Sequence, residues 1–334
     1  MLQNDDAAII CQNLSRRYGS LVALDDLNLS VPAHSVFGFL GPNGAGKSTA
    51  IKLLTGQIQP SQGQAWVAGI KVGGKTVEAH RHIGYLSELP QFYGWMRGQE
   101  FLEFIGELFG LKPTELRERA KSLLRTVGLE EAARRKISGY SGGMRQRLGI
   151  AQAMVNRPAV IFLDEPVSAL DPLGRRDVLK LLDDLRSETT VFMSSHVLLD
   201  VDRVCDRIAI LNRGKLVIEG PTAELKARYT QPNLELELEG GIAAAQAFLP
   251  ILQSHEWLGR VELLEDGRLK LAFGNETAMR KANYEIPRLV AAHNLGLLHY
   301  GLSVPTLEDI FVELVGQADP SQPISPQPLV VSSQ

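Results

Sequence analysis

Short apolar runs alternate with amphipathic stretches along the chain from Ala8 to about Pro221. Two of these runs, "VFGFL" and the first four residues of "VIFLDE", are continuously apolar over the length of a strand, which is typical of strands covered on both faces. The runs "TVFMSS" and "RIAIL" have a similar character. The pattern therefore predicts an α/β domain in which strands alternate with crossover helices.

The pattern changes between Gln91 and Met154, where apolar residues follow long helical periods punctuated by Gly and Pro. We interpret this stretch as a helical subdomain over about 91–155, inserted between two groups of strands. A further unit begins after Tyr229 with the alternating "LELELE" and continues through a predicted hairpin at Asp266 and Gly267. It closes on a short predicted helix in "PTLEDIFVEL".

These changes of pattern predict three parts. A first domain covers residues 1–229, and a smaller accessory α+β domain covers residues 230–317. The last residues, 318–334, are rich in Pro, Ser and Gln and are expected to be disordered.

Composition narrows the classes of function. The formal net charge is -3, so the charge balance predicts no nucleic-acid partner. Cys11 and Cys205 are the only cysteines and are expected to be reduced core residues of a cytosolic protein. The sequence shows neither an export signal nor a stretch apolar enough to span a bilayer. We expect a soluble chain that contacts a membrane only through a partner.

The stretch "FGFLGPNGAGKSTAIKLL" carries the first chemical motif, G-x-x-x-x-G-K-[ST], between a predicted strand and a predicted helix. Glycines let successive backbone N–H groups point into one concavity, and the helix adds its positive end, so the segment predicts a nucleoside triphosphate site. Lys47 is expected to reach the β- and γ-phosphates, and Ser48 to bind Mg²⁺. The alternative is an ordinary glycine-rich turn. The predicted cradle consists of Gly41, Pro42, Asn43, Gly44, Ala45, Gly46, Lys47, Ser48 and Thr49.

Two carboxylates and a histidine follow predicted strands. Asp164 and Glu165 end "VIFLDE", and ligands gather at the carboxyl ends of parallel strands. Asp164 is suited to holding Mg²⁺ and Glu165 to accepting a proton from water. The alternative is a pair of acids in a surface turn. His196 follows "TVFMSS", although a single histidine there is more often structural than catalytic.

These motifs, with "YSGGMRQR" (Tyr140–Arg147, here the signature segment) and "SALD" (Ser168–Asp171), resemble the nucleotide-binding subunit of an ATP-binding cassette (ABC) protein over about Ala8–Pro221. The resemblance implies an α/β fold with a P-loop NTPase (RecA-like) core and an antiparallel β edge. It also implies that the signature segment of one subunit closes on the phosphate loop of another, with ATP and Mg²⁺ between them. Since the chain has one of each segment, a homodimer or pairing with a related ABC subunit is implied.

The resemblance assigns further roles. It implies that Tyr18 of "RYGS" stacks on adenine, although the residues alone equally allow a buried aromatic. It implies that Lys47 and Ser48 bind the phosphates and Mg²⁺, and that Asp164 supports the metal. It also implies that Glu165 is the general base and that His196 contacts the γ-phosphate. Asp171 is implied to link the two sites across the dimer, and the signature contacts to ATP are implied for Ser141, Gly142 and Gly143.

Two positions depart from the family pattern. Glu88 stands where the family usually has Gln as a ligand of Mg²⁺ and water. A carboxylate also binds Mg²⁺, while the alternative is a loop carboxylate that is only solvated. Tyr140 replaces the usual Leu before "SGG". Because backbone N–H groups form the phosphate contact, we expect that replacement to cause no loss of phosphate binding.

The end of the accessory domain indicates the kind of transport. "SVPTLEDIFVELVG" looks like the close of ATP-binding subunits that pair with ABC-2 type exporter permeases. This resemblance implies export through a separate integral membrane permease, with the chain in the cytoplasm, peripheral at the inner face of the cell membrane. The alternatives are an importer ATPase and a soluble ABC ATPase acting on ribosomes or DNA. Intact Lys47, Asp164, Glu165 and His196 disfavour a catalytically silent cassette.

The aromatic stretch "QFYGWMRGQEFLEF" predicts the surface that docks on the permease, because aromatic residues and Met are enriched at interfaces. Trp95 and Met96 are the residues in which a charge is expected to uncouple ATP hydrolysis from the permease. The alternative is that this stretch forms the core of the helical subdomain.

Overall fold

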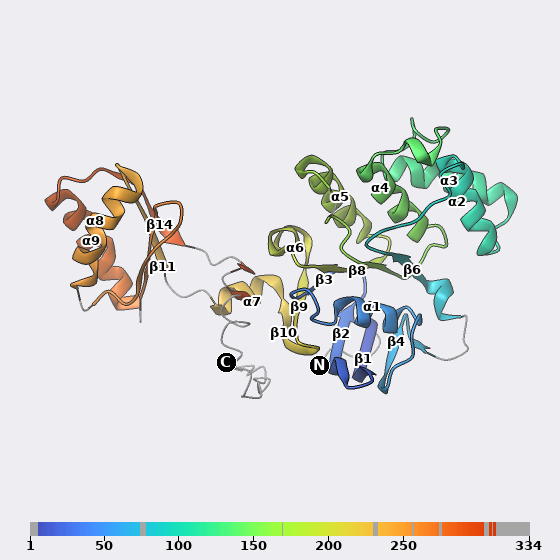
Figure 1. The fold of residues 1–334 in the computed structure, drawn as a ribbon, viewed down its shortest axis with the longest axis horizontal. Helices are drawn as coiled ribbons and strands as arrows, with labels where there is room; N and C mark the ends of the chain where they lie inside the picture. The colour runs from blue at the N-terminus through green and yellow to red at the C-terminus, as the bar shows by residue number, and fades with distance from the viewer. Residues whose placement is uncertain are drawn as a thin grey trace. The chain divides into compact units, whose positions relative to one another are not determined.

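The structure of the chain, a computed structural model, describes residues 6–73, 78–168, 170–229, 233–255, 257–273, 276–303, 307–308 and 310–311. The described residues divide into two compact units, one up to Thr222 and one from Ala223 onward. The division falls at the start of helix α7 (Thr222–Tyr229), whereas the sequence places the boundary after residue 229. Figure 1 shows both units, and each is described by itself. The tail predicted over 318–334 lies outside the described residues.

A six-stranded sheet forms the centre of the first unit. Its strands β9, β3, β8, β7 and β6 are parallel, and β10 pairs antiparallel with β9 at one edge. In order across the sheet these are β10 (Lys215–Pro221), β9 (Arg207–Asn212), β3 (Val36–Leu40), β8 (Thr190–Ser195), β7 (Val160–Leu163) and β6 (Ile83–Leu86). Every residue of β3 and β7 is buried, as their continuous apolar sequences predict. The predicted α/β fold is confirmed.

An antiparallel sheet packs on one side of this centre. It contains β2 (Leu21–Pro32), β1 (Ala7–Tyr18), β4 (Gln62–Val67) and β5 (Ile70–Val72), in that order. Helix α1 (Lys47–Leu54) lies between the two sheets, and residues of both sheets and of α1 share one apolar core (Figure 1). Helices α5 (Pro172–Leu185) and α6 (Leu198–Val204) cover the other face of the six-stranded sheet (Figure 1).

Three helices, α2 (Gly98–Leu108), α3 (Pro113–Thr126) and α4 (Gly142–Ala153), form the helical part of the first unit between β6 and β7. The sequence sets where they begin. Pro113 opens α3, where its missing N–H costs nothing, and the Glu115 side chain accepts from Lys112 N at 3.4 Å. Short 3₁₀ turns cover Ala79–His82 and Ile137–Gly139.

The second unit is an antiparallel sheet with helices on one face. The sheet order is β12 (Val261–Leu263), β13 (Leu269–Ala272), β11 (Asn233–Leu238) and β14 (Leu297–Ser303). Helices α8 (Gly241–Gln253) and α9 (Glu276–Ala292) supply residues to the same apolar core as the alternate leucines of β11. The hairpin at Asp266 and Gly267 is confirmed, with Gly267 at φ 86°. The helix predicted in "PTLEDIFVEL" lies partly outside the described residues.

The structure also describes the two cysteines and the apolar character of the helices. Cys11 and Cys205 are buried free thiols. Burial raises the pKa of the Cys11 thiol to about 12, and burial also raises the pKa of Cys205. Within the described ranges, the structure contains no helix with the length and apolar character needed to cross a membrane.

Candidate functional site

The loop between β3 and α1 is a cradle of main-chain groups. Gly44 and Gly46 have φ values of 81° and 107°, in the region that side chains disfavour. A Cβ on Gly41 would lie 2.5 Å from Leu211 O, and one on Gly46 would lie 2.4 Å from Ala23 O. Gly46 precedes α1 and gives it no side-chain cap. The first-turn N–H groups of α1 are therefore not capped from Gly46, as an anion site at a helix N-terminus requires.

Lys47 holds its ammonium group within this loop. The residue is only 6% exposed. Its Nζ donates to Gly41 O at 2.8 Å and to Pro42 O at 3.4 Å. The same Nζ forms an ion pair with Glu165 Oε1 at 3.5 Å. One positive charge is thereby fixed beside the bare backbone.

Asp164 and Glu165 follow β7 and are organised by Ser194 on the neighbouring strand β8. Ser194 Oγ donates to Asp164 Oδ1 at 2.6 Å and accepts from Glu165 N at 2.9 Å. Ser48 Oγ donates to the same Asp164 oxygen at 3.3 Å. The predicted carboxylates therefore lie at the phosphate loop, as expected for residues at the carboxyl ends of parallel strands. The sequence analysis missed Ser194, although its place at the end of "TVFMSS" was a usable signal.

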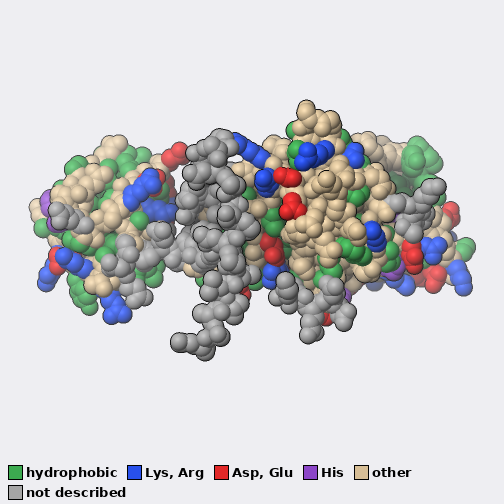
Figure 2. Space-filling model, turned by 90° about the horizontal axis from the view of Figure 1, so that it is seen from below, with side chains coloured by type: hydrophobic (Ala, Val, Ile, Leu, Met, Phe, Trp, Pro, Cys, Tyr) green, Lys and Arg blue, Asp and Glu red, His purple; other side chains and the backbone are tan. Residues whose placement is uncertain are grey.

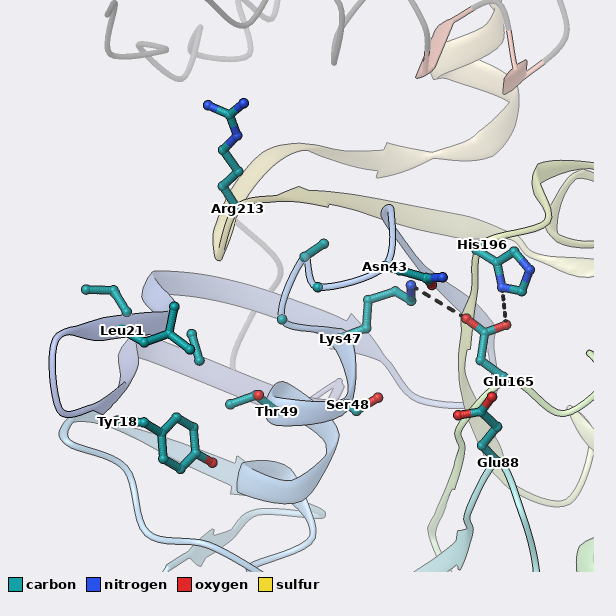
Figure 3. Close-up of a pocket in the computed structure, with 15 residues that line it drawn as sticks. Tyr18, Leu21, Asn43, Lys47, Ser48, Thr49, Glu88, Glu165, His196 and Arg213 are labelled. Atoms are coloured by element: carbon teal, nitrogen blue, oxygen red, sulfur yellow. Dashed lines mark hydrogen bonds and ion pairs between the residues drawn. The ribbon is translucent and has the colours of Figure 1, made fainter. Parts of the chain in front are cut away.

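Glu165 contacts two other side chains of the site. It has φ 50°, a backbone conformation that is uncommon for a residue with a side chain and that is enriched at functional sites. His196 Nδ1 lies 2.9 Å from Glu165 Oε2, while Lys47 lies on the other carboxylate oxygen. Figure 3 shows both side chains directed at Glu165, each toward a different carboxylate oxygen. His196 therefore lies beside the carboxylates that follow β7 and close to the phosphate loop.

These groups face a cavity of about 580 Å³ (Figure 3). Most of the site residues expected from sequence line it. Gly41, Pro42 and Asp164 do not line it, but they form hydrogen bonds with Lys47 and Ser48, which do. Leu21, Val22, Ala23 and Arg213 also line the cavity but were missed by the sequence analysis. The full lining is Tyr18, Leu21, Val22, Ala23, Asn43, Gly44, Ala45, Gly46, Lys47, Ser48, Thr49, Glu88, Glu165, His196 and Arg213.

An aromatic side chain lies at the end of the cavity away from Glu165. Tyr18 is 44% exposed, so the alternative of a buried aromatic is wrong. The Arg16 guanidinium carbon lies 4.5 Å from the centroid of the Tyr18 ring. Leu21 lies on the same side of the site as Tyr18, whereas Arg213 lies apart from both at the turn between β9 and β10 (Figure 3). An exposed aromatic ring beside an apolar side chain is suited to stacking on a planar ring.

The signature segment lies elsewhere. Ser141 caps α4 by accepting from Met144 N at 3.2 Å, and Ser141 and Gly142 are exposed. Tyr140 is buried and its Oη donates to Ala132 O at 2.8 Å, so the ring has a structural place at this position. Asp171 is exposed and caps α5 by accepting from Gly174 N at 2.7 Å. Among the described residues, the cavity lining contains neither Asp171 nor any member of the signature segment.

The aromatic stretch after β6 divides into surface and core. Leu89, Tyr93 and Trp95 are exposed, Trp95 by 71%, and they are called here the aromatic surface. Met96 is only 9% exposed and belongs to the buried residues of the helical part. The expectation that a charge at Met96 would act on docking is therefore wrong, because the residue is packed inside. For Trp95 the expectation stands as a proposal.

Oxygen atoms near the phosphate loop are suited to Mg²⁺. Ser48 and Asp164 are in contact, and Glu88 lines the same cavity. The described part of the chain holds no cluster of three or more His, Cys, Asp or Glu side chains of metal-binding geometry. Mg²⁺ commonly takes one or two protein carboxylates and completes its shell with phosphate and water. The donor set fits a magnesium ion that arrives with a polyphosphate.

Comparisons with known proteins agree with this geometry. A family model described as "ABC transporter" matches residues 24–168. Daunorubicin resistance ATP-binding protein DrrA3 of Streptomyces coeruleorubidus is 34% identical over 93% of this chain and 96% of its own. Bacitracin transport ATP-binding protein BcrA of Bacillus licheniformis is 32% identical over 91% of this chain and 96% of its own. A dimeric structure of the ATP-binding cassette MJ0796, in a post-hydrolysis state bound to ADP and Pi, has a TM-score of 0.58 and 25% identity, covering 64% of this chain and 98% of that one.

Proposed function

Because the chain belongs to the family of ABC transporter ATP-binding proteins, we propose that it hydrolyses ATP as a dimer and thereby drives export through a separate membrane permease. The observation that carries the proposal is the position of Glu165. Its carboxylate lies between Lys47 and His196 on the wall of a cavity whose floor is a bare glycine loop. This arrangement places a base beside an anion site.

Each side chain then has a chemical task. Lys47 exchanges Glu165 for the β- and γ-phosphate oxygens when the triphosphate binds. This exchange leaves Glu165 to accept the proton of the attacking water, while His196 orients the carboxylate and contacts the γ-phosphate. Ser48, Asp164 and Glu88 would hold Mg²⁺, which neutralises phosphate charge when bound. Tyr18 stacks on adenine at the other end of the cavity.

A second copy supplies the rest of the site. Ser141, Gly142 and Gly143 lie at the start of helix α4, where Ser141 and Gly142 are exposed, and a helix N-terminus attracts anions. In one chain they do not line the cavity that holds Lys47. A head-to-tail dimer brings the α4 terminus of each copy to the phosphates of the other, with Asp171 between the two sites. The solved structure of MJ0796, which is dimeric and bound to ADP and Pi, supports dimerisation by similarity.

The relatives favour export. One is named for bacitracin transport and another for daunorubicin resistance, and both are matched over nearly their whole length. We infer that this chain also works with a permease that moves a substrate outward, and that it lies at the inner face of the membrane through that partner. An importer ATPase is the second candidate, and a soluble ABC ATPase acting on ribosomes or DNA is the third. Figure 2 gives it no support, because acidic and basic side chains of the described residues are interspersed on the face shown.

Purification of the chain from its native membrane tests the proposal. The expected result is a complex with a polytopic permease that hydrolyses ATP and, in vesicles, moves substrate to the side opposite the nucleotide-binding subunits. Movement toward that side would favour an importer. Recovery with ribosomes or DNA instead of a membrane protein would contradict the transport function.

Trp95 tests the aromatic surface. We expect Trp95→Asp to weaken the permease complex by about 2 kcal/mol or more, roughly 30-fold, because an exposed aromatic anchor is lost. Its melting temperature should stay near that of the parent, since the side chain is 71% exposed. Met96→Asp is the contrasting variant and should unfold the helical part, because it buries a charge. Permease pull-down and thermal melts measure both, and equal melting losses in the two variants would place Trp95 in the core.

Ser194 tests how the carboxylates are organised. We expect Ser194→Ala to cost about 1–3 kcal/mol of unfolding free energy, because Glu165 N and Asp164 Oδ1 lose a buried partner. ATP turnover should fall as well. Ser35→Ala is the control, since Ser35 is also buried but its Oγ donates to Pro32 O at 2.7 Å and the residue does not line the cavity. Urea unfolding and ATPase assays decide, and equal turnover in the two variants would remove Ser194 from its organising role.

A further inference from the structure

A partly buried ion pair joins the two helices that follow His196 and Asp171. Helix α6 begins at Leu198, just after His196, and helix α5 begins at Pro172, directly after Asp171. Asp200 Oδ2 on α6 lies 3.7 Å from Arg175 Nε on α5. Asp200 is 1% exposed, and neither residue lines the cavity.

The ion pair is expected to add little to the free energy of unfolding. Arg175 Nε and Asp200 Oδ2 are both buried, and neither has a hydrogen-bond partner among the described residues. Burial raises the pKa of the Asp200 carboxyl, and the nearby charges of Arg175, Arg203 and His196 oppose that rise, whereas Glu165 adds to it. Buried ion pairs are often no more stabilising than apolar residues of the same volume. The position of the pair is therefore more informative than its strength.

One end of the pair is tied to the catalytic carboxylate. His196 Nδ1 contacts Glu165 Oε2 at 2.9 Å. Between His196 and α6 the chain is held by Val197 N, which donates to Ser195 Oγ at 2.9 Å. A displacement of His196 is therefore passed to the start of α6, on which Asp200 lies.

The other end is tied to the segment that faces the second copy. Arg175 N donates to Asp171 O at 2.9 Å, in the first turn of α5. The Asp171 side chain caps the same turn through Gly174 N. Arg175 and Asp171 belong to one hydrogen-bonded turn. A displacement of the Arg175 side chain is therefore expected to displace Asp171.

The length of the pair allows it to respond to small movements. At 3.7 Å it is longer than a charge-assisted hydrogen bond, which is about 2.7–2.9 Å. Charges interact strongly in a buried, weakly screening environment. A slide of α6 against α5 by less than an ångström therefore changes the energy of the pair.

We propose that the Asp200–Arg175 ion pair transmits the movement of His196 to Asp171, and so couples hydrolysis at one ATP to the surface that receives the second copy. The inference rests on the proposed ATP-driven dimer. Asp200 and Arg175 are positioning residues in it, since they act through His196 and Asp171 and touch neither nucleotide nor metal.

The test is steady-state ATP hydrolysis by the complete chain over a range of ATP concentrations. The variants are Asp200→Asn, Arg175→Met and the two together. We expect each single change to lower kcat about tenfold or more, because small misplacements near a reacting centre cost up to ~10²-fold. KM for ATP should not change, and the Hill coefficient should fall toward one. The double variant should be no worse than either single variant, because both remove one shared interaction.

The Arg207–Glu219 pair supplies a matched control. Arg207 Nη2 lies 2.7 Å from Glu219 Oε1, and the pair is also partly buried in the same unit. Arg207→Met is expected to lower the melting temperature without changing the Hill coefficient. If Asp200→Asn fails to fold, Asp200→Glu and Arg175→Lys keep the charges while changing the geometry. A lower kcat at an unchanged melting temperature in these two variants supports the coupling.

Three results would overturn the inference. Folded variants with the parent's kcat and Hill coefficient would show that the pair transmits nothing. Losses that multiply in the double variant would show that the two residues act separately. A parent chain that binds but never hydrolyses ATP would overturn the proposed function and this inference together, whereas an active parent with unaffected variants would overturn the inference alone.

Discussion

Glu165→Gln is expected to leave ATP binding intact and to slow ATP hydrolysis by about 10²–10⁴, the usual contribution of a positioned general base. The amide keeps the size of the side chain and can still contact His196, but it cannot accept the proton of water. The backbone at φ 50° and the bond from Glu165 N to Ser194 do not depend on the side-chain charge. The loss should therefore fall on kcat and not on folding.

Phosphate release at saturating ATP measures this effect, and equilibrium dialysis with labelled ATP measures binding. Glu188→Gln is the control, because Glu188 is an exposed carboxylate of the same unit, after α5. Its turnover should match the parent's. If Glu165→Gln also turns over ATP at the parental rate, another group is the base.

Lys47→Ala is expected to weaken ATP binding by about 10- to 100-fold. A hydrogen bond to a charged group contributes roughly 1.5–3 kcal/mol, and each 1.4 kcal/mol is about tenfold in affinity. The variant deletes the cation that Gly41 O and Pro42 O hold in the loop. It also leaves Glu165 without its ion-pair partner, so a modest loss of stability should accompany the weaker binding.

A titration with a fluorescent ATP analogue measures the affinity, and a thermal melt shows that the variant is folded. Lys52→Ala is the matched control, since Lys52 is an exposed lysine of the same helix α1. Its affinity for ATP should equal the parent's. Undiminished affinity in folded Lys47→Ala would mean that the loop backbone binds the phosphates without this ammonium group.

Much of the first unit follows from local sequence. Strands β3 and β7 are buried on both faces, and such strands need apolar residues at every position, which is a pattern that a sequence displays directly. The glycine loop is equally visible, because close contacts at Gly41 and Gly46 exclude a side chain. Strand ends also predicted that Asp164 and Glu165 lie near the loop.

The contacts between segments that are distant in the sequence could not be predicted from local sequence patterns. That Ser194 joins Asp164 and Glu165 depends on β7 and β8 being neighbours in the sheet, and single-sequence patterns do not give strand order. Arg213 reaches the cavity through a turn between β9 and β10 that has no chemical motif. Trp95 and Met96 are adjacent in sequence, yet one is exposed and one is buried, because local chain direction decides which side chain packs inside.

The central claim is that the cavity of one copy is completed by helix α4 of another. Sedimentation velocity of the Glu165→Gln chain with Mg²⁺ and saturating ATP tests it most directly, because slow hydrolysis should preserve the closed state. The account predicts a dimer with ATP, a monomer with ADP, and a monomer again when Ser141→Arg blocks the α4 terminus. A chain that binds ATP at Lys47 and stays monomeric at saturation would contradict the account.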